Sequence, residues 1–364
     1  MPLDLGLIIL WSMVQVHHGP PNTPAAVLSR PPKMSAIQTA HSVAADLNFK
    51  SVQYTALHAG PKLIVTGAVH GNETCGTEAI QRVLADIDQQ RLRIVRGEVT
   101  FVPVTNPLAY RRRDRAGDRN LNRNLYPVAA PADFEDHVAN WLCPLLARHE
   151  VLLDLHSTRA QNPPFAMLGP ENNGGSLQPF QHAEKERALA KRLGVNRFVD
   201  GWLDTYAKGV QRRVQAANAG GVHLNTLNTD PRYGVGTTEY MRSVGGYAIT
   251  LECGAHDDPA SPEVGYRAIV NTLAFLGISA QPAPGPVDRF EALRMMEVHD
   301  KNAAGDRFSR EWGSFDRLAK GDLIGTRADG TLIVAEDEGC ILFPDAKAMP
   351  GHEWFYVTKT IAEI

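Results

Sequence analysis

Residues 61–74 read PKLIVTGAVHGNET, and this stretch decides the fold class. The run from Lys62 to Ala68 is apolar, rich in β-branched side chains and interrupted by a glycine, which predicts a short buried strand. Residues 77–87 then carry apolar side chains at helical spacing, which predicts a helix directly after the strand. A strand followed closely by a helix is typical of an α/β domain.

The same alternation continues along the chain. Three further strands and three further helices are expected, the strands at 97–104, 151–155 and 247–251, and the helices at 134–149, 184–193 and 264–276. A polar, arginine-rich loop is expected from residue 106 to residue 127. Strands that alternate with helices predict a mixed sheet covered by helices on both faces.

The length of 364 residues suggests two domains as a prior. Residues 1–33 are rich in proline beyond a short apolar run, and we expect a poorly ordered extension there, with Met34 as an alternative start. Residues 34–280 form the expected main domain. The segment QPAPGP at 281–286 predicts a linker, and the short strand-like runs of residues 287–364 predict a small β-barrel-like domain.

Composition excludes several classes of protein. Lysine and arginine total 37 against 40 acidic residues, and this net charge of −3 argues against a nucleic-acid binder. No apolar run reaches the length of a membrane span. The apolar run near the N-terminus follows Asp4 without any basic residue, which argues against a secretion signal. Four widely spaced cysteines without a CxxC pair favour a reducing compartment, so we expect a cytoplasmic protein.

Candidate metal ligands stand where the predicted strands end. His70 and Glu73 follow the first strand, and His156 ends the strand that contains Asp154. Imidazole and carboxylate are ligands that catalytic zinc takes, and three of them leave a position for water. Asp154 lies on the same face as His156 and could orient it. The alternatives are a solvated loop pair for His70 and Glu73, and a capping role for His156.

Glu252 ends a third apolar strand, next to Cys253. A glutamate beside activated water can take its proton and pass it to a leaving amine. The alternative is an ordinary glutamate on an edge strand. Cys253 has no accompanying nucleophile signature, so we expect a buried structural thiol.

The loop 111–123 reads RRRDRAGDRNLNR and contains six arginines. Such a run can form a solvated basic patch, but guanidinium groups also bind carboxylates in two-pronged fashion and stabilise oxyanions. We expect residues 111–113 to lie on the surface. Arg115, Asn122 and Arg123 are the better candidates for a site.

Four pieces of the sequence together resemble the succinylglutamate desuccinylase/aspartoacylase family of the zinc carboxypeptidase superfamily. They are GAVHGNET, NPLAYRRRDRAGDRNLNRNLYP, LLDLHS and ITLECG, at residues 67–74, 106–127, 152–157 and 249–254. The resemblance covers about residues 60–276, and the C-terminal segment resembles the family's small β-domain. It implies a zinc carboxypeptidase-like catalytic domain.

The resemblance also implies residue roles, which concern seven positions. His70, Glu73 and His156 match the zinc ligands, Glu252 the general base and acid, and Arg115 the group that polarises the scissile carbonyl, while Asn122 and Arg123 match the pair that binds the substrate's carboxylate. One departure stands out: Asn120 occupies a position where the family commonly has aspartate.

The activity implied is that of a zinc-dependent amidohydrolase, with one Zn²⁺ per chain, that deacylates a small N-acyl amino acid or a related carboxylate-bearing amide. The alternatives are a zinc carboxypeptidase acting on peptides and a non-catalytic binding protein on the same fold. An intact Glu252 argues against the last. The expected partner is a small-molecule substrate, and neither nucleic acid nor a membrane is expected. The protein could form a homo-oligomer.

Overall fold

The computed structural model of the protein describes residues 47–218 and 229–364. The extension predicted at residues 1–33 lies outside the described residues. The helices are α2 (Cys75–Asp88), α3 (Pro107–Arg112), α4 (Phe134–Leu146), α5 (Ala183–Ala190), α6 (Trp202–Asn218), the 3₁₀ helix η1 (Pro231–Gly234), α7 (Thr237–Ser243) and α8 (Ser261–Phe275). The strands are β1 (Val52–Thr55), β2 (Lys62–Thr66), β3 (Glu98–Val102), β4 (Val151–Thr158), β5 (Phe165–Met167), β6 (Arg197–Asp200), β7 (Tyr247–Ala255), β8 (Glu291–Asp300), β9 (Arg307–Phe308), β10 (Arg317–Leu318), β11 (Leu323–Thr326), β12 (Leu332–Val334), β13 (Gly339–Leu342) and β14 (Glu353–Ile361).

Four parallel strands form the centre of the main sheet, in the order β3-β2-β4-β7. Their carboxyl ends therefore meet at one edge. The antiparallel strands β1 and β5 flank this centre, so the sheet is mixed, as predicted. The register pairs His156 of β4 directly with Glu252 of β7, which brings two of the predicted site residues side by side.

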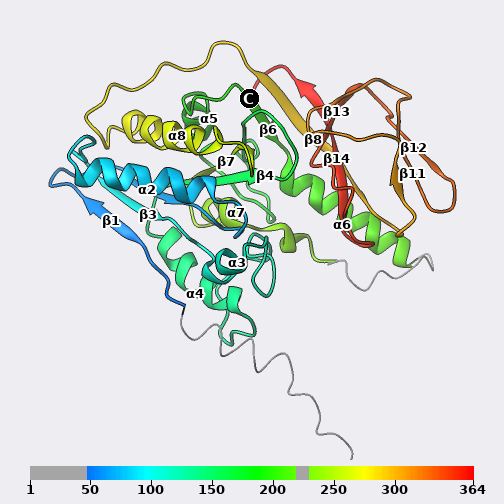
Figure 1. Ribbon diagram of the computed structural model, residues 1–364, viewed down its shortest axis with the longest axis horizontal. Helices are drawn as coiled ribbons and strands as arrows, with labels where there is room; N and C mark the ends of the chain where they lie inside the picture. The colour runs from blue at the N-terminus through cyan, green and yellow to red at the C-terminus, as the bar shows by residue number, and fades with distance from the viewer. Residues whose placement is uncertain (1–46, 219–228) are drawn as a thin grey trace, which may run out of the picture. The chain divides into compact units, whose positions relative to one another are not determined.

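Helices cover both faces of this sheet, because alternate strand residues point to opposite sides. Leu63 and Val65 of β2 pack into one core with side chains of α2, α5 and α8. Ile64, between them, packs into a second core with side chains of α4 and α7. Figure 1 shows α2 and α8 on one side of the central strands and α3 and α4 on the other. The predicted α/β fold class is confirmed.

The C-terminal segment is β-rich, as predicted, but it does not begin a separate sheet at the linker. β8 pairs in parallel with β6, at residues 291–294 against 197–200, and β14, β13 and β10 then extend the same sheet. Only β12, β11 and β9 form a sheet of their own. The predicted linker at residues 281–286 therefore does not separate two sheets, because the open edge of β6 accepts β8.

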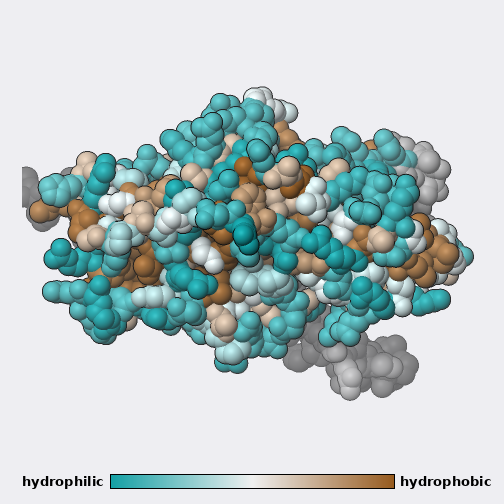
Figure 2. Space-filling model, turned by 90° about the horizontal axis from the view of Figure 1, so that it is seen from above, coloured by the Kyte–Doolittle hydropathy of each residue, from teal (hydrophilic) through white to brown (hydrophobic). Residues whose placement is uncertain are grey.

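The small three-stranded sheet has one buried and one exposed apolar face. Ile324 and Ile333 point inward and pack with Trp354 of β14. Leu332 and Val334 point outward and are exposed. Figure 2 shows a mainly hydrophilic surface, with hydrophobic side chains also visible toward the end where Figure 1 places β11 and β12. Among the described residues, no helix is long and apolar enough to cross a membrane.

Candidate active site

The predicted metal ligands meet at the carboxyl edge of the central strands. His70 and Glu73 lie in the turn between β2 and α2, and His156 lies on β4. One ligand atom from each of the three side chains lies within 4.8 Å of the others, and all three residues are buried. The structure thus brings together residues that stand 83 positions apart in the sequence.

The turn that carries His70 and Glu73 depends on Gly71. A Cβ atom on Gly71 would lie 1.9 Å from the carbonyl carbon of Ala109 in α3. No real side chain tolerates that distance, so only glycine lets this turn lie directly against α3. The close approach explains why the HGNE sequence needs its second residue.

In each histidine, Nδ1 faces Glu73, and Nε2 faces a hydrogen-bond acceptor on the opposite side of the ring. The Nδ1 atoms of His70 and His156 each lie 2.8 Å from a carboxylate oxygen of Glu73. The Nε2 atom of His156 lies 2.8 Å from Asp154, and that of His70 lies 3.0 Å from the side-chain oxygen of Asn120. An acceptor behind each ring fixes the tautomer that leaves Nδ1 free to bind a metal.

Asp154 is fully buried and held in place by two hydroxyl groups. Thr66 donates to one carboxylate oxygen at 2.6 Å, and Thr237 donates to the other at 2.5 Å. Burial acts to raise the pKa of Asp154, but the charge of His156 and these hydrogen bonds outweigh it and keep the pKa below its ordinary value. Asp154 is therefore ionised, and its negative charge lies against Nε2 of His156.

The arrangement of charges fits a bound cation. Burial disfavours an imidazolium at His156, yet Asp154 and Glu73 on either side hold the pKa of His156 well above its ordinary value. At His70, burial and the nearby Arg115 lower the pKa to about 4. Two buried carboxylates thus require one positive charge between them, which a proton on His156 supplies and a divalent metal would supply better.

Glu252 lies beside these residues, paired in register with His156. It is buried, and its Oε2 atom has no hydrogen-bond partner among the described residues. Burial, together with the charges of Glu73 and Asp154, raises its pKa to about 7, against the opposing effect of His156 and Arg115. A carboxyl group that has a pKa near 7 and one oxygen without a hydrogen bond to the described residues is suited to accepting and donating a proton.

We predict that ionised Glu252 destabilises the metal-free protein. Folding raises its pKa from 4.5 to about 7, so the stability that it contributes is full below pH 4.5 and is lost as pH rises to about 7. Glu252→Gln removes this dependence. In thermal unfolding of protein freed of metal with a chelator, the melting temperature of the variant should match that of wild type near pH 4.5 and exceed it at pH 8. A melting difference that does not change with pH would contradict the assignment.

Arg115 reaches the centre from the arginine-rich loop. Its Nη1 atom lies 3.1 Å from Glu73, while about half of its side chain is exposed. The loop is held by Glu135 of α4, a fully buried carboxylate that accepts hydrogen bonds from three successive backbone N–H groups of residues 117–119 and from Asn106. Residues 111–113 are exposed, as predicted.

Asn122 and Arg123 lie on the wall of the same cavity. The side-chain oxygen of Asn122 accepts a hydrogen bond from the backbone N–H of Thr237 at 2.9 Å, which leaves its amide group as a donor. The guanidinium of Arg123 lies over the ring of Trp202, 4.6 Å from its centroid, and donates to the carbonyl of Asn122. Among the described residues, no salt bridge joins Arg123 to a carboxylate.

The cavity measures about 1350 Å³ and is lined by both halves of the chain. The C-terminal segment contributes Glu353 and Tyr356 of β14. The hydroxyl of Tyr356 is buried, and no residue in the described ranges hydrogen-bonds to it. Burial acts to raise the pKa of Glu353, but Arg123 and Arg213 outweigh it and lower the pKa. No local motif marks these residues, and the sequence analysis missed them.

His256 is a third lining residue that the sequence analysis missed. Its Nδ1 atom lies 2.8 Å from the hydroxyl of Ser157, and its Nε2 atom lies 3.3 Å from the amide of Asn72. The ring thus ties the ends of β2, β4 and β7 together. A polar residue shortly after ITLECG was the only signal for it in the sequence.

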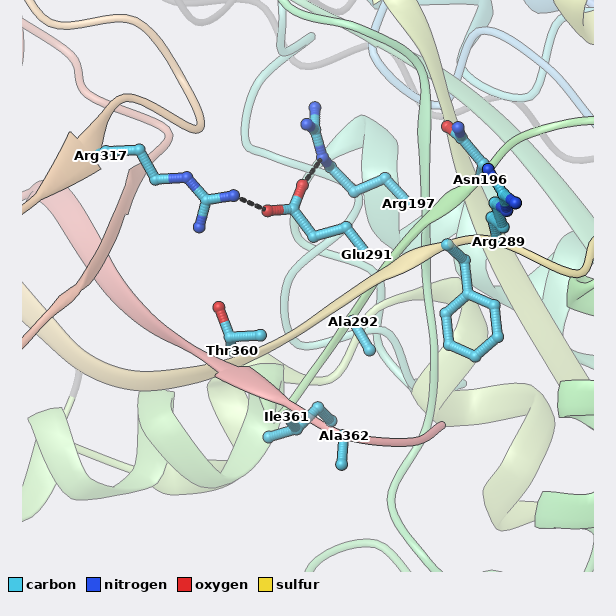
Figure 3. A pocket seen from close by; sticks show the side chains of 10 residues that line it. Asn196, Arg197, Arg289, Glu291, Ala292, Arg317, Thr360, Ile361 and Ala362 are labelled. Atoms are coloured by element: carbon cyan, nitrogen blue, oxygen red, sulfur yellow. Dashed lines mark hydrogen bonds and ion pairs between the residues drawn. The ribbon is translucent and has the colours of Figure 1, made fainter.

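A smaller pocket of about 510 Å³ lies away from these residues, at the starts of β6 and β8 (Figure 3). Glu291 there accepts from Arg197 Nε at 2.5 Å and from Arg317 Nη2 at 2.6 Å. Both carboxylate oxygens are engaged, and the group links β6, β8 and β10. We therefore regard it as a structural ion-pair cluster.

One family model matches part of the chain. Residues 59–171 match the model of the succinylglutamate desuccinylase/aspartoacylase catalytic domain. That segment contains His70, Glu73, Arg115 and His156. No curated protein sequence matches the chain at a significant level.

Solved structures share the fold over most of the chain. The product-bound ectoine utilization protein EutE (DoeB) of Ruegeria pomeroyi is 19% identical, with a TM-score of 0.62 over 85% of this chain and 88% of that one. A succinylglutamate desuccinylase/aspartoacylase of Rhodobacter sphaeroides is 17% identical, with a TM-score of 0.63 over 87% and 90%. The succinylglutamate desuccinylase of Vibrio cholerae is 16% identical, with a TM-score of 0.63 over 85% of each chain. The resemblance to this family is confirmed.

Proposed function

We propose that the protein is a zinc-dependent hydrolase that cleaves the amide bond of a small N-acyl amino acid or a related carboxylate-bearing amide. One observation carries the proposal: buried Glu252, whose Oε2 atom has no hydrogen-bond partner in the described part of the chain, lines the same cavity as the buried group of His70, Glu73 and His156. The family resemblance and the names of the related structures favour a deacylase.

His70, Glu73 and His156 would hold the metal through two imidazole nitrogens and a carboxylate, which suits zinc. A bound zinc ion supplies a Lewis acid that activates water and polarises a carbonyl group. We propose one ion per chain, as the three residues form a single group.

The chain's own residues perform the proton and charge chemistry. Glu252 takes a proton from the attacking water and delivers it to the departing nitrogen, because an unprotonated amide nitrogen would have to leave as an anion and leaves poorly. Arg115 reaches into the cavity with half of its side chain exposed, and donates to the carbonyl oxygen as negative charge develops there. Burial of Glu252 raises its pKa to about 7, which suits both proton steps near neutral pH.

Arg123 and Asn122 bind the substrate's carboxylate and fix its position. The guanidinium is oriented by Trp202 and by the carbonyl of Asn122, so it is held before the substrate arrives. A pre-oriented guanidinium binds a planar carboxylate through two parallel hydrogen bonds. This contact sets which amide bond lies beside Glu252.

We predict that Arg123→Lys raises KM about 10- to 100-fold with little change in kcat. A charged hydrogen bond contributes about 1.5–3 kcal/mol, and an ammonium group does not reproduce the two-pronged contact. Steady-state kinetics measure the split between KM and kcat. Arg93→Lys, at an exposed position outside the cavity, is the matched control. Equal KM values for both variants would remove this role from Arg123.

A peptide substrate is the second candidate, because the cavity of about 1350 Å³ is large for one small amide. Purified, zinc-loaded protein assayed with N-acetyl, N-succinyl and N-formyl amino acids beside a set of dipeptides separates the two. Turnover of acyl amino acids at least tenfold faster than of dipeptides supports the deacylase. The reverse order supports a carboxypeptidase, and no turnover of either set contradicts hydrolysis.

A further inference from the structure

The two histidines of the centre are supported unequally. Behind His156 lies the carboxylate of Asp154, at 2.8 Å, while behind His70 lies the amide oxygen of Asn120, at 3.0 Å. Asp154 is fully buried, and two hydroxyl groups also hold it. The first support therefore carries a charge in a buried site, and the second carries none.

The direction of the Asn120 amide is fixed by the backbone. The N–H of Asn122 donates to Oδ1 of Asn120 at 2.9 Å, so this atom is the oxygen. The same oxygen faces Nε2 of His70, which must then carry the proton. His70 consequently presents an unprotonated Nδ1 on the side of the ring that faces Glu73.

We propose that Asn120 is a positioning residue that orients His70 correctly but makes it the weaker of the two histidine ligands of the metal. This inference rests on the proposed metal site. A carboxylate polarises the ring N–H strongly and increases electron density at the opposite nitrogen, whereas a neutral amide does so less. The metal is then held mainly by Glu73 and His156, with His70 as the more easily released ligand.

The choice of an amide also limits the negative charge in the cavity. Glu73, Asp154 and Glu252 already place three carboxyl groups around the centre. A fourth, behind His70, would make the centre less electrophilic and would oppose an anionic substrate. The ligands are thus correctly oriented, but the metal affinity is lower than it would be if a carboxylate lay behind each of the two histidines.

The test is a series at residue 120, read as the zinc dissociation constant rather than as activity. Full-length wild type, Asn120→Asp and Asn120→Ala are stripped of metal and titrated with zinc against a chromophoric chelator. Loss of one supporting partner typically changes affinity 10- to 100-fold. We expect Asn120→Asp to bind zinc about 10- to 100-fold more tightly than wild type, and Asn120→Ala to bind it more weakly.

Ala116→Asp is the charge control, because it adds a carboxylate to the cavity wall at a residue other than Asn120, the partner of His70 Nε2. Melting of the metal-free forms checks the fold of each variant. If Asn120→Asp binds zinc within twofold of wild type, or if Ala116→Asp tightens binding equally, the inference is overturned. If wild type itself does not bind one zinc per chain, the proposed metal site fails instead.

Discussion

Glu252→Gln is expected to reduce kcat by at least about 10³-fold while the protein keeps its metal. General acid–base catalysis typically contributes about 10²- to 10⁴-fold, and a single residue that serves in both proton steps should lie in the upper part. Glutamine preserves the size of the side chain but cannot take a proton. Steady-state kinetics on the best substrate, with elemental analysis of the same preparation, measure both quantities.

Two results would remove this role from Glu252. One is turnover within tenfold of wild type, and the other is loss of the metal together with activity, which would make Glu252 a ligand. Glu311→Gln is the matched control, since Glu311 lines the cavity but is exposed and lies in the C-terminal segment. It should keep kcat near the wild-type value.

His156→Ala is expected to reduce bound zinc from about one ion per chain to near none. Zinc requires its nitrogen and oxygen ligands together, and removal of one leaves only His70 and Glu73. The variant also leaves Asp154 as a buried carboxylate without its charged partner, which should lower the melting temperature.

His137→Ala, at an exposed position on α4, is the control for losing a histidine. Elemental analysis and thermal melting of both variants give the comparison. In parallel, a chelator should abolish the activity of wild type, and added zinc should restore it. Full zinc occupancy in folded His156→Ala would show that the metal is held elsewhere.

Much of the central fold could be predicted from local patterns. Strands β2, β4 and β7 are apolar runs that end in polar residues, and parallel strands place those ends at one edge of the sheet. The convergence of His70, His156 and Glu252 follows from that arrangement. These strands are buried along nearly their whole length, which is why their sequence signal is strong.

The rest depends on contacts between distant segments. β5 and β6 have only three and four residues, too few for a periodic pattern, yet β5 joins β6 to β7 and β6 pairs with β8. Glu135 holds the loop of Arg115 through backbone N–H groups, which leave no trace in the sequence of the loop. The contribution of Tyr356 to the cavity likewise follows from the register of β14.

The pairing of β8 with β6 has a practical consequence for protein engineering. A chimera joined at residues 281–286 would replace the edge partner of β6 together with the wall of the cavity, so the donor segment would have to reproduce that strand register. A chimera joined inside the C-terminal segment, beyond β8, keeps the native pairing of β6 with β8. Residues 301–306 and 343–352 connect strands and line the cavity in part, so exchanging these loops would change the wall of the cavity while β8 and β14 keep the sheet intact.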